Sequence, residues 1–354
     1  MSRIQQSYDI LEKSKLTNGM WAASTSDDYN FTWFRDTAYI ALTFIDKTCD
    51  TYERAIQGML DILTDYDEKL DGIPKTDRDF PHIRYNATTF KEVDTDWGHV
   101  QLDAYGAVLF AVGEGERRGK KIIRDEKDRE TIQKLVGFLE HNEYHLLEDS
   151  GAWEEWREIR LSSIAAVVAG LEAVSNLVFV SSEMIHQGYK TLYGLYPRET
   201  PTRDVDLFQL TLIYPYRLVS KPIAQKIIAQ VEDKLLREKG VLRYQGDSYY
   251  STLEKEYGRD RELDFYVGSE AQWTFGFSYL ALSLMTIGEY DEAKKYIDKV
   301  ESVVLEDGGL PELYYSGDYR DEYGNNFNKN NPLIWSNAMF IQAKEMHQRR
   351  IKDE

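Results

Sequence analysis

GAWEEWREIRLSSIAAVVAGLEAV, residues 151–174, joins a tryptophan-rich polar segment to an apolar run with helical spacing. The apolar side chains of that run recur at intervals of three and four residues, which is the period of a core-facing helix rather than a strand. They are Ile164, Val167, Val168, Leu171 and Val174. We therefore expect an amphipathic helix here, with the charged residues of the segment at its start.

The same spacing recurs in four other segments, and each of these predicts a helix with one apolar face. Their stripes are Phe34, Ala38, Ala41, Leu42 and Ile45; Ile132, Leu135, Val136 and Leu139; Ile223, Ile227, Ile228, Val231 and Leu235; and Tyr290, Ala293, Tyr296, Ile297, Val300 and Val304. Weaker helical patterns lie near residues 2–14, 50–67, 98–119, 178–190, 204–214, 268–286 and 332–350. Together they predict an all-α chain of about twelve helices.

Helices in this number can pair as about six hairpins. With alternately short and long connections they close into a double ring, in which inner helices line a funnel and outer helices cover them. No change in composition, low-complexity tract or fixed repeat marks a second domain. We predict a single (α/α)6 barrel domain over residues 1–354.

The long connections of this barrel are expected to carry its function. They fall at residues 14–33, 68–97, 143–153, 237–267 and 305–331, where Gly, Asn, Asp and Pro interrupt the helical pattern. Loops longer than about 12 to 15 residues are uncommon unless they are functional or disordered. Because these loops hold most of the Trp residues, we place the active site at the loop-rich rim of the barrel.

Charge and composition exclude several classes of partner. The net charge of -18 repels phosphates, so we do not expect nucleic acid to bind. No apolar stretch approaches the roughly 18 to 20 residues of a membrane span. The N-terminal segment lacks the apolar core of a signal peptide, and Cys49 is the only cysteine, so no intrachain disulfide can form. These features favour the cytoplasm.

Aromatic residues are abundant, with 25 Tyr and 7 Trp in segments that also carry Asp, Asn and Glu. The C–H faces of a sugar ring stack on aromatic side chains, while carboxylates and amides bind its hydroxyls. This composition favours a carbohydrate ligand. The alternative is that the rings fill the core.

Two adjacent carboxylates, Glu154 and Glu155, stand between Trp153 and Trp156 at the predicted start of a helix. Adjacent helical side chains point about 100° apart, so one of the two could face a scissile bond while the other binds a hydroxyl. Apolar indole neighbours raise the pKa of a carboxyl by desolvation, which a general acid needs. The alternative is structural, because acids in a first helical turn complement the helix dipole.

A second candidate carboxylate, Glu312, lies in the loop DGGLPELYY, although it could also be a solvated loop acid. Two carboxylates suffice to hydrolyse an acetal without a metal, since one protonates the leaving oxygen and the other activates water. The six His residues show no metal-binding spacing. We therefore predict no metal and no cofactor.

Charged residues also flank tryptophans at the starts of predicted helices. Arg35 and Asp36 follow Trp33, and Trp97 precedes Gln101 and Asp103. Such residues could bind the terminal hydroxyls of a sugar ring. The alternative for Arg35 and Asp36 is a local ion pair at a helix cap.

Taken together, these strings resemble the glucoamylase-type glycoside hydrolases of family 15, whose catalytic domain is an (α/α)6 barrel and to which a domain of phosphorylase kinase α subunits is related. The resemblance runs through NGMWAASTSDDYNFTWFRD, RYNATTF, DWGHVQLDA, GAWEEW, GGLPE and NNPLIWSNA, and so spans nearly the whole chain.

The resemblance implies roles for individual residues. Glu154 corresponds to the general acid, Glu312 to the general base and Glu155 to a substrate contact. Arg243 matches a substrate-binding arginine, and Trp273 and Trp335 could line the funnel or belong to the core. The full set of predicted substrate-binding residues is Tyr29, Trp33, Arg35, Asp36, Trp97, Trp153, Glu155, Arg243, Trp273 and Trp335.

These roles imply an exo-acting enzyme that holds the non-reducing-end glucose and inverts the anomeric centre, with carboxyl groups about 6.5 to 9.5 Å apart. The chain departs from the family in having Leu313 after the general base, where many members have Gln, and this bears on the hydrogen bonding expected around the base. It also lacks a β-sandwich and a starch-binding module, which favours a short α-linked substrate. Two alternatives are a non-catalytic glucan-sensing domain of the phosphorylase kinase α type and a different α/α-barrel enzyme, such as a uronyl hydrolase.

Overall fold

Buried and amphipathic elements alternate along the chain in the computed structural model, which describes residues 2–25, 31–93, 95, 97–98 and 100–353. The largely buried elements are α2 (Phe34–Ala41), α5 (Leu102–Arg117), α7 (Leu161–Val174), the 3-10 helix η4 (Leu207–Leu212), α11 (Phe275–Thr286) and the first half of α13 (Ile334–Asp353). The amphipathic helices are α1 (Arg3–Lys13), α3 (Thr51–Asp65), α6 (Glu126–His141), α8 (Ser182–Leu195), α9 (Lys221–Leu235) and α12 (Tyr290–Val303). This alternation is the one expected of helical hairpins with an inner and an outer member.

The predicted helix near residues 204–214 is instead a 3-10 helix, η4. It begins with a capping box in which the Asp206 side chain accepts from the backbone of the first turn and Gln209 reaches back to the Asp206 backbone. The element stops before Pro215, which has no N–H to continue a helical ladder. Residues 207–212 are nonetheless buried, so η4 takes the place of a buried helix in the alternation.

Several short elements were not predicted, because two to four residues are too few to show a period. Antiparallel pairs form between β1 (Phe31–Trp33) and β2 (Arg84–Asn86), and between β3 (Gln272–Trp273) and β4 (Leu313–Tyr314). The remaining short elements are η2 (Leu42–Phe44), α4 (Asp67–Leu70), η3 (Asp77–Asp79), α10 (Glu254–Tyr257) and η5 (Leu263–Phe265).

The chain divides into two compact units. The first, here called the 30–202 unit, contains Lys15–Ala23 and Asn30–Thr202. The second, the 203–354 unit, contains Met1–Ser14, Ser24–Tyr29 and Arg203–Glu354. A single catalytic domain over residues 1–354 stays a prediction.

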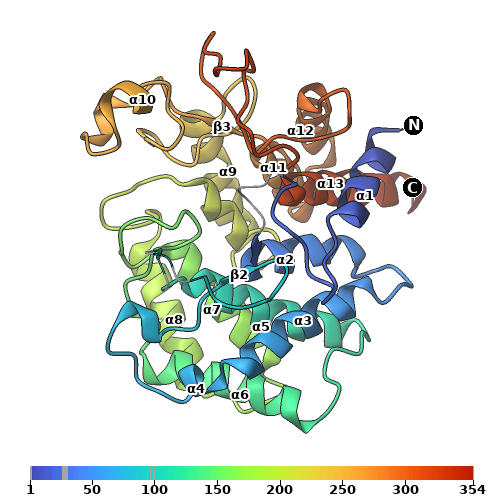
Figure 1. Ribbon diagram of the computed structural model, residues 1–354, viewed down its shortest axis with the longest axis vertical. Coiled ribbons are helices and arrows are strands. Elements are labelled where there is room, and N and C mark those ends of the chain that lie inside the picture. Colours follow the sequence, from blue (N-terminus) through green and yellow to red (C-terminus); the bar gives the residue numbers. More distant parts are fainter. Residues whose placement is uncertain (1, 26–30, 94, 96, 99, 354) are drawn as a thin grey trace. The chain divides into compact units, whose positions relative to one another are not determined.

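Within the 30–202 unit, α5 and α7 lie side by side at backbone contact (Figure 1). A Cβ added at Gly106 would lie 2.3 Å from the carbonyl carbon of Ala166, and one added at Gly113 would lie 2.3 Å from the carbonyl oxygen of Ala173. The absence of a side chain at these two positions therefore sets how closely the helices approach. This pair carries the segments that position the candidate acid.

Within the 203–354 unit, the first and last helices of the chain pack together. The Ser7 hydroxyl of α1 donates to Asn337 of α13 at 3.1 Å, and the Tyr8 hydroxyl donates to Glu345 at 2.6 Å. In addition, α11 packs against α12 and α13. None of the helices in the described part of the chain has the length and apolar character needed to cross a membrane.

Candidate active site

Glu154 lies in a tight turn, not in the first turn of a helix as the sequence predicted. Helix α7 begins only at Leu161, and residues 151–154 form a turn closed by a hydrogen bond from the Glu154 N–H to the Gly151 carbonyl at 3.1 Å. Apolar periodicity placed the helix correctly but could not show where its first turn starts. The predicted helix-dipole role of the two glutamates, and the 100° argument about their directions, therefore do not apply.

The backbone of Glu154 is in the left-handed region, with φ of 59°. This conformation costs an L-residue about 1 to 2 kcal/mol, and outside glycine it is concentrated in turns and functional sites. Gly151, at the other end of the turn, also has a positive φ, and a Cβ there would lie 2.3 Å from the Arg160 side chain. The turn therefore depends on a glycine at one end and imposes strain at the other.

The carboxylate of Glu154 is held through one of its two oxygens. The Trp33 indole Nε1 donates to Oε1 at 2.9 Å, and the Gln101 amide donates to the same atom at 3.3 Å. The Arg35 guanidinium lies 3.9 Å from it. All three contacts fall on Oε1, while the side chain as a whole remains 16% exposed.

Arg35 connects the candidate acid to helix α5. Its Nε donates to Asp103 at 2.5 Å, and its other nitrogens reach the side chain of Gln101 and, at 3.4 Å, the carbonyl of Gly151. Burial opposes the charge of Arg35, but the Asp103 and Glu154 carboxylates outweigh it and hold the pKa of Arg35 well above its usual range. Arg35 thus does form an ion pair, as the structural alternative required, and its partner is Asp103.

The tryptophans of the 30–202 unit differ in exposure. Trp33 is buried and Trp153 nearly so, whereas Trp97 is 39% exposed. The guanidinium of Arg84 lies 4.0 Å from the Trp97 ring centroid and 5.8 Å from that of Trp33, and it donates to Thr95 at 2.6 Å. Arg84 therefore contacts two of the predicted substrate-binding tryptophans, and the sequence analysis did not single it out.

The other predicted residues of this unit are Asp36, Glu155 and Tyr29. Asp36 is buried in the first turn of α2, and Glu155 is half-buried with its N–H donating to the Ser150 carbonyl at 3.1 Å. Tyr29 lies outside the described residues.

Asp149 anchors the turn that carries Glu154, and it too was missed. Its Oδ2 accepts from the backbone N–H of Leu102 at 3.0 Å and of Gly151 at 3.1 Å, and from the hydroxyl of Ser163 at 2.9 Å. One oxygen thus joins the start of α5, the turn and the start of α7. Burial raises the pKa of Asp149 to about 7, although the charge of Arg160 opposes the rise.

In the 203–354 unit, Glu312 is buried and held by two asparagine side chains. Its Oε2 accepts from the amide of Asn328 and, at 2.7 Å, from that of Asn330. Its backbone N–H donates to the Asn330 carbonyl at 3.0 Å, and its carbonyl accepts from Thr274 at 3.3 Å. The predicted concern about Leu313 is answered structurally, since these asparagines supply the hydrogen bonds and Leu313 is buried in β4.

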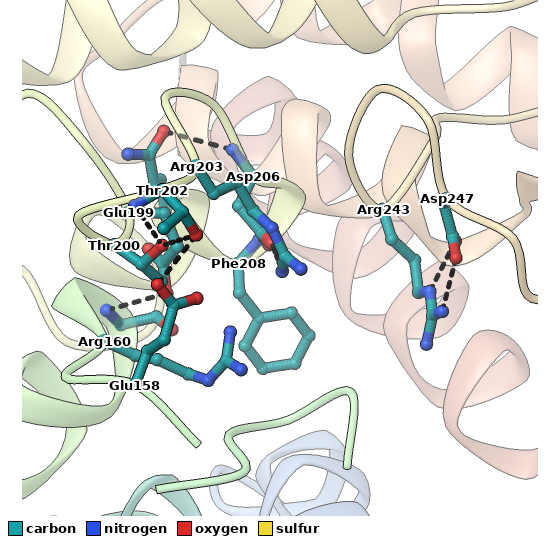
Figure 2. Close-up of polar contacts among 12 residues, drawn as sticks. Glu158, Arg160, Glu199, Thr200, Thr202, Arg203, Asp206, Phe208, Arg243 and Asp247 are labelled. Carbon is teal, nitrogen blue, oxygen red and sulfur yellow. Dashed lines mark hydrogen bonds and ion pairs between the residues drawn. The ribbon is translucent and has the colours of Figure 1, made fainter. Parts of the chain in front are cut away.

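Arg243 and Trp273 belong to the same unit as Glu312. Trp273 pairs with Leu313 across β3 and β4. Arg243 makes a two-point ion pair with Asp247, both contacts being 2.6 Å (Figure 2), and its guanidinium lies 5.4 Å from the Trp273 ring. Asp247 therefore fixes the direction of Arg243.

Trp335 is embedded among other aromatic residues at the start of α13. Its ring stacks on Phe275 at 4.8 Å and meets Phe208 edge-on at 5.7 Å. These contacts are those of a core residue, which was one of its two sequence interpretations. Its role as a substrate contact stays a prediction.

The candidate acid and the candidate base belong to different units. The 30–202 unit brings together Trp33, Arg35 and Glu154, and the 203–354 unit brings together Arg243, Trp273 and Glu312. Of these residues, Trp33, Arg35 and Trp273 stand at or just before the N-terminus of a buried helix. Among the described residues, no group of His, Cys, Asp and Glu is arranged to hold a metal ion.

The sequence pattern of the family described as "Glycosyl hydrolases family 15" matches residues 7–182, a stretch that includes the Glu154 turn, Arg35 and Gln101. Residues 7–182 belong to glycosyl hydrolase family 15. The match to this family confirms the resemblance seen in the sequence.

Solved structures show a similar fold over nearly the whole chain. A glycosidase variant in complex with glucose matches with a TM-score of 0.79 at 18% identity, covering 98% of this chain and 96% of that one. A glucoamylase from Saccharomycopsis fibuligera matches with a TM-score of 0.66 at 13% identity, covering 98% and 94%. The predicted fold class, the (α/α)6 barrel of glucoamylases, is thereby confirmed.

Among curated proteins, the chain is similar to phosphorylase kinase subunits. A probable phosphorylase b kinase regulatory subunit alpha of Caenorhabditis elegans is 28% identical over 343 residues, which cover 82% of this chain and 28% of that protein. The skeletal muscle alpha subunit of Rattus norvegicus is 24% identical over 404 residues, covering 98% and 32%. The chain spans about a third or less of the length of these relatives.

Proposed function

We propose that the protein is an inverting, exo-acting α-glucoside hydrolase that releases β-glucose from the non-reducing end of short α-glucans or α-linked disaccharides. The observation that carries the proposal is the Glu154 turn, a strained backbone that presents one carboxylate with Oε1 fixed by Trp33, Gln101 and Arg35. Strain of this kind is costly unless the position of the side chain is needed.

In the proposed mechanism, Glu154 is the general acid. Because its contacts fall on Oε1, the proton given to the glycosidic oxygen is carried by Oε2. The positive charge of Arg35 and the indole N–H of Trp33 stabilise the carboxylate that remains after proton transfer.

Glu312 is the proposed general base. Amide N–H groups donated to a carboxylate favour its ionised form, which is the form that removes a proton from water. Asn328 and Asn330 provide two such groups on Oε2. Attack from the side opposite the leaving oxygen inverts the anomeric centre and requires about 6.5 to 9.5 Å between the two carboxyl groups.

Substrate binding is assigned to the remaining predicted residues. Asp36, Glu155 and Arg243 would bind hydroxyls, and Trp33, Trp97 and Tyr29 would form the walls around the terminal glucose. Arg35, given its ion pair with Asp103, would bind the sugar while also fixing Glu154. The solved relative with bound glucose supports a glucose-sized ligand. The proposal includes no nucleic acid, metal or cofactor. The expected location is still the cytoplasm.

A second candidate function is a non-catalytic glucan-sensing domain, and the similarity to phosphorylase kinase alpha subunits is the observation that favours it. The two candidates differ in turnover. Maltose, isomaltose and trehalose should be incubated with the protein, with the anomer of released glucose followed by NMR.

Initial formation of the β configuration at the cleaved anomeric centre of any of the three supports the hydrolase, and formation of the α configuration at that centre contradicts inversion. With trehalose the leaving glucose is itself the α-anomer, so inversion gives equal amounts of α- and β-glucose and retention gives only α-glucose. Binding without turnover supports the sensing domain. Glu312→Gln should abolish most turnover while binding persists, and Arg35→Ala should chiefly weaken binding; near-normal behaviour of either variant would remove that residue from its role.

A further inference from the structure

The candidate acid stands in a loop whose two ends are hydrogen-bonded to each other. The N–H of Asp149 donates to the Glu158 carbonyl at 3.0 Å, and the N–H of Glu158 donates to the Asp149 carbonyl at 3.1 Å. Residues 150–157, here called the acid loop, lie between these ends and include Glu154. Because the backbone of the loop is closed at its base, a side chain that holds the loop elsewhere can set the position of Glu154.

Arg160 is such a side chain. It is the residue before the first turn of α7, and its side chain turns back along the acid loop. Its Nε donates to the Asp149 carbonyl at 3.2 Å, and its Nη2 donates to the Trp156 carbonyl at 2.5 Å. These carbonyls belong to opposite ends of the loop. Since the guanidinium is planar and rigid, its two donors hold the carbonyls at a set separation.

The stem of Arg160 contacts the residue at which the Glu154 turn starts. A Cβ added at Gly151 would lie 2.3 Å from Cδ and 2.7 Å from Nε of Arg160. The Gly151 carbonyl accepts from the Glu154 N–H at 3.1 Å and lies 3.4 Å from a guanidinium nitrogen of Arg35. Gly151 is thus the point of contact between Arg160 and two residues of the candidate site.

The burial of Arg160 is costly. Arg160 is 2% exposed, and the two hydrogen bonds described above go to uncharged carbonyl groups. Burial raises the pKa of Asp149 to about 7, while the charge of Arg160 opposes the rise and that of Asp103 adds to it. Below about pH 7, Asp149 therefore carries its proton and does not balance the guanidinium charge. A buried charge without full compensation lowers stability, so its presence calls for another reason.

We propose that Arg160 is a positioning residue for the general acid. It holds the acid loop so that the strained turn keeps the Glu154 carboxylate on Trp33 and Arg35. The inference rests on the proposed function, because it concerns the placement of the proton donor in that reaction. It uses residues of the 30–202 unit alone.

Turnover by two Arg160 variants tests the proposal, with the α-glucoside that the unsubstituted protein cleaves and at a pH below 7. Methionine keeps an unbranched stem but has no donor, so Arg160→Met loses both hydrogen bonds to the loop. Its kcat should fall about 10- to 100-fold, the cost of a small misplacement, while KM changes less than about 2-fold. Arg160→Lys, which restores a donor, should recover part of the loss.

Arg157→Met is the matched control. Arg157 is an arginine of the same loop that also donates to a backbone carbonyl, that of Glu148 at 2.9 Å, but it is 33% exposed and pairs with Asp77 at the surface. This variant should keep near-parental kcat, because exposed ion pairs contribute little. An unchanged kcat in Arg160→Met, a change in KM alone, or an equal fall in the Arg157 variant would overturn the proposal.

Gly151→Ala tests the same contact from the other side. In the parent its Cβ would meet the Arg160 stem, so kcat should fall. In Arg160→Ala, where the stem is absent, the same substitution should cost at least about 5-fold less. The strain of alanine at a φ of 59° is common to both backgrounds and cancels. Losses that simply multiply would mean that the two residues act independently, which contradicts the proposal.

The Trp33 indole reports on the position of Glu154 without any turnover, because its N–H donates to Oε1 at 2.9 Å. Its NMR resonance, assigned with Trp33→Phe, should move in Arg160→Met toward the position that it takes in Glu154→Ala, and its hydrogen exchange should become faster. A structural role confined to the stability of α7 would leave this resonance in place. Arg157→Met should also leave it unmoved.

The two measurements separate this proposal from the proposed function. If the parent hydrolyses no α-glucoside but the indole resonance depends on Arg160, the positioning role stands and the hydrolase is refuted. If the parent hydrolyses its substrate and Arg160→Met keeps the parental kcat, the hydrolase stands and the positioning role is refuted. Absence of both hydrolysis and an indole shift refutes both.

Discussion

At the scale of single residues, the site depends on side chains that fix other side chains. Trp33 and Gln101 fix Glu154, Asp103 fixes Arg35, and the asparagines fix Glu312. A proton-transfer group must be held in position to act efficiently, and a carboxylate with one oxygen already bonded has fewer orientations to lose.

Replacing Glu154 by Gln should lower kcat about 10²- to 10⁴-fold, the contribution typical of a general acid, with little change in binding because size and polarity are kept. Steady-state kinetics and calorimetry would measure the two effects. Glu158→Gln is the matched control, because Glu158 follows in the same loop but bonds Trp156 and Thr202 instead (Figure 2 shows the Thr202 contact), and it should retain near-parental kcat. A similar loss in both variants would argue against a special role for Glu154.

The backbone strain at Glu154 gives a second prediction at this scale. Glu154→Gly and Glu154→Ala both remove the carboxylate, but only glycine adopts a φ of 59° without cost. Glu154→Gly should therefore be more stable than Glu154→Ala by about 1 kcal/mol. Urea unfolding of the two variants would measure the difference. Equal stabilities would mean that the turn relaxes on substitution and that little strain is stored there.

At the scale of elements, close packing of α5 on α7 and the Asp149 anchor place the Glu154 turn. The helices meet backbone to backbone, and one carboxylate oxygen ties the start of each to the turn between them. The position of the candidate acid is therefore a property of these two elements together.

Gly106→Ala should destabilise the protein by about 1 to 3 kcal/mol, because the new Cβ would lie 2.3 Å from the α7 backbone and the helices would have to separate. Gly137→Ala, in the interior of α6, has no atom within 4 Å of its Cβ and should stabilise by about 0.5 to 1 kcal/mol. Denaturant unfolding of both variants checks the opposite signs. A neutral Gly106→Ala would contradict the packing argument.

Asp149 predicts a pH dependence of stability. Its pKa is raised to about 7 in the folded chain, against about 3.9 in an unfolded one. The native state therefore binds the proton more tightly, and the stabilisation from this group is fully present below about pH 4 and is lost as pH rises through about 7. The whole effect amounts to as much as about 4 kcal/mol.

The side chain in Asp149→Asn is uncharged at every pH, so the variant does not lose stability at this position as pH rises. The free energy of unfolding of the variant minus that of the parent should therefore increase as pH rises from 4 to 8. The substitution itself can add a constant to this difference at every pH. Urea unfolding at several pH values measures the difference. A difference independent of pH would show that Asp149 stays ionised in the fold.

At the scale of the whole molecule, binding should be coupled to stability. A ligand that binds only the folded chain stabilises it by about 2.7 kcal/mol at a concentration 100 times its dissociation constant. We expect glucose or a slowly cleaved α-glucoside to raise the midpoint of urea unfolding accordingly, and Arg35→Ala to remove most of that rise. Mannitol, a polyol without the ring, serves as the control ligand, and an equal rise with it would indicate a solvent effect.

Much of the fold could be predicted from sequence because burial leaves a local pattern. The stripes at residues 164–174, 223–235 and 290–304 became α7, α9 and α12, close to their predicted bounds. The strands β1 to β4, the 3-10 form of η4 and the late start of α7 could not, because a few residues carry too little periodicity to outweigh tertiary contacts.

Some site residues were noted in the sequence, but their contacts could not be predicted from it. Gln101 and Asp103 were noted beside Trp97, and the structure makes them the partners of Arg35. Asn330 and Arg84 are the first residues of the strings NNPLIWSNA and RYNATTF, but neither was singled out there. Asn328 and Asp149 lie outside the quoted strings and looked like ordinary polar residues. What distinguishes them is near-complete burial, which is not a property of the residue type.

By itself, the sequence determined the alternation of buried and amphipathic helices and the net acidic charge. It also determined which residues resemble a glycosidase site. Each of these follows from local spacing or composition. Only the tertiary structure decided that Glu154 sits in a left-handed turn, that its Oε1 is bound by Trp33 and Gln101, and that asparagines hold Glu312. The reason is physical: these contacts join residues far apart in the chain, and which atoms meet is set by how closely the helices pack rather than by any local preference.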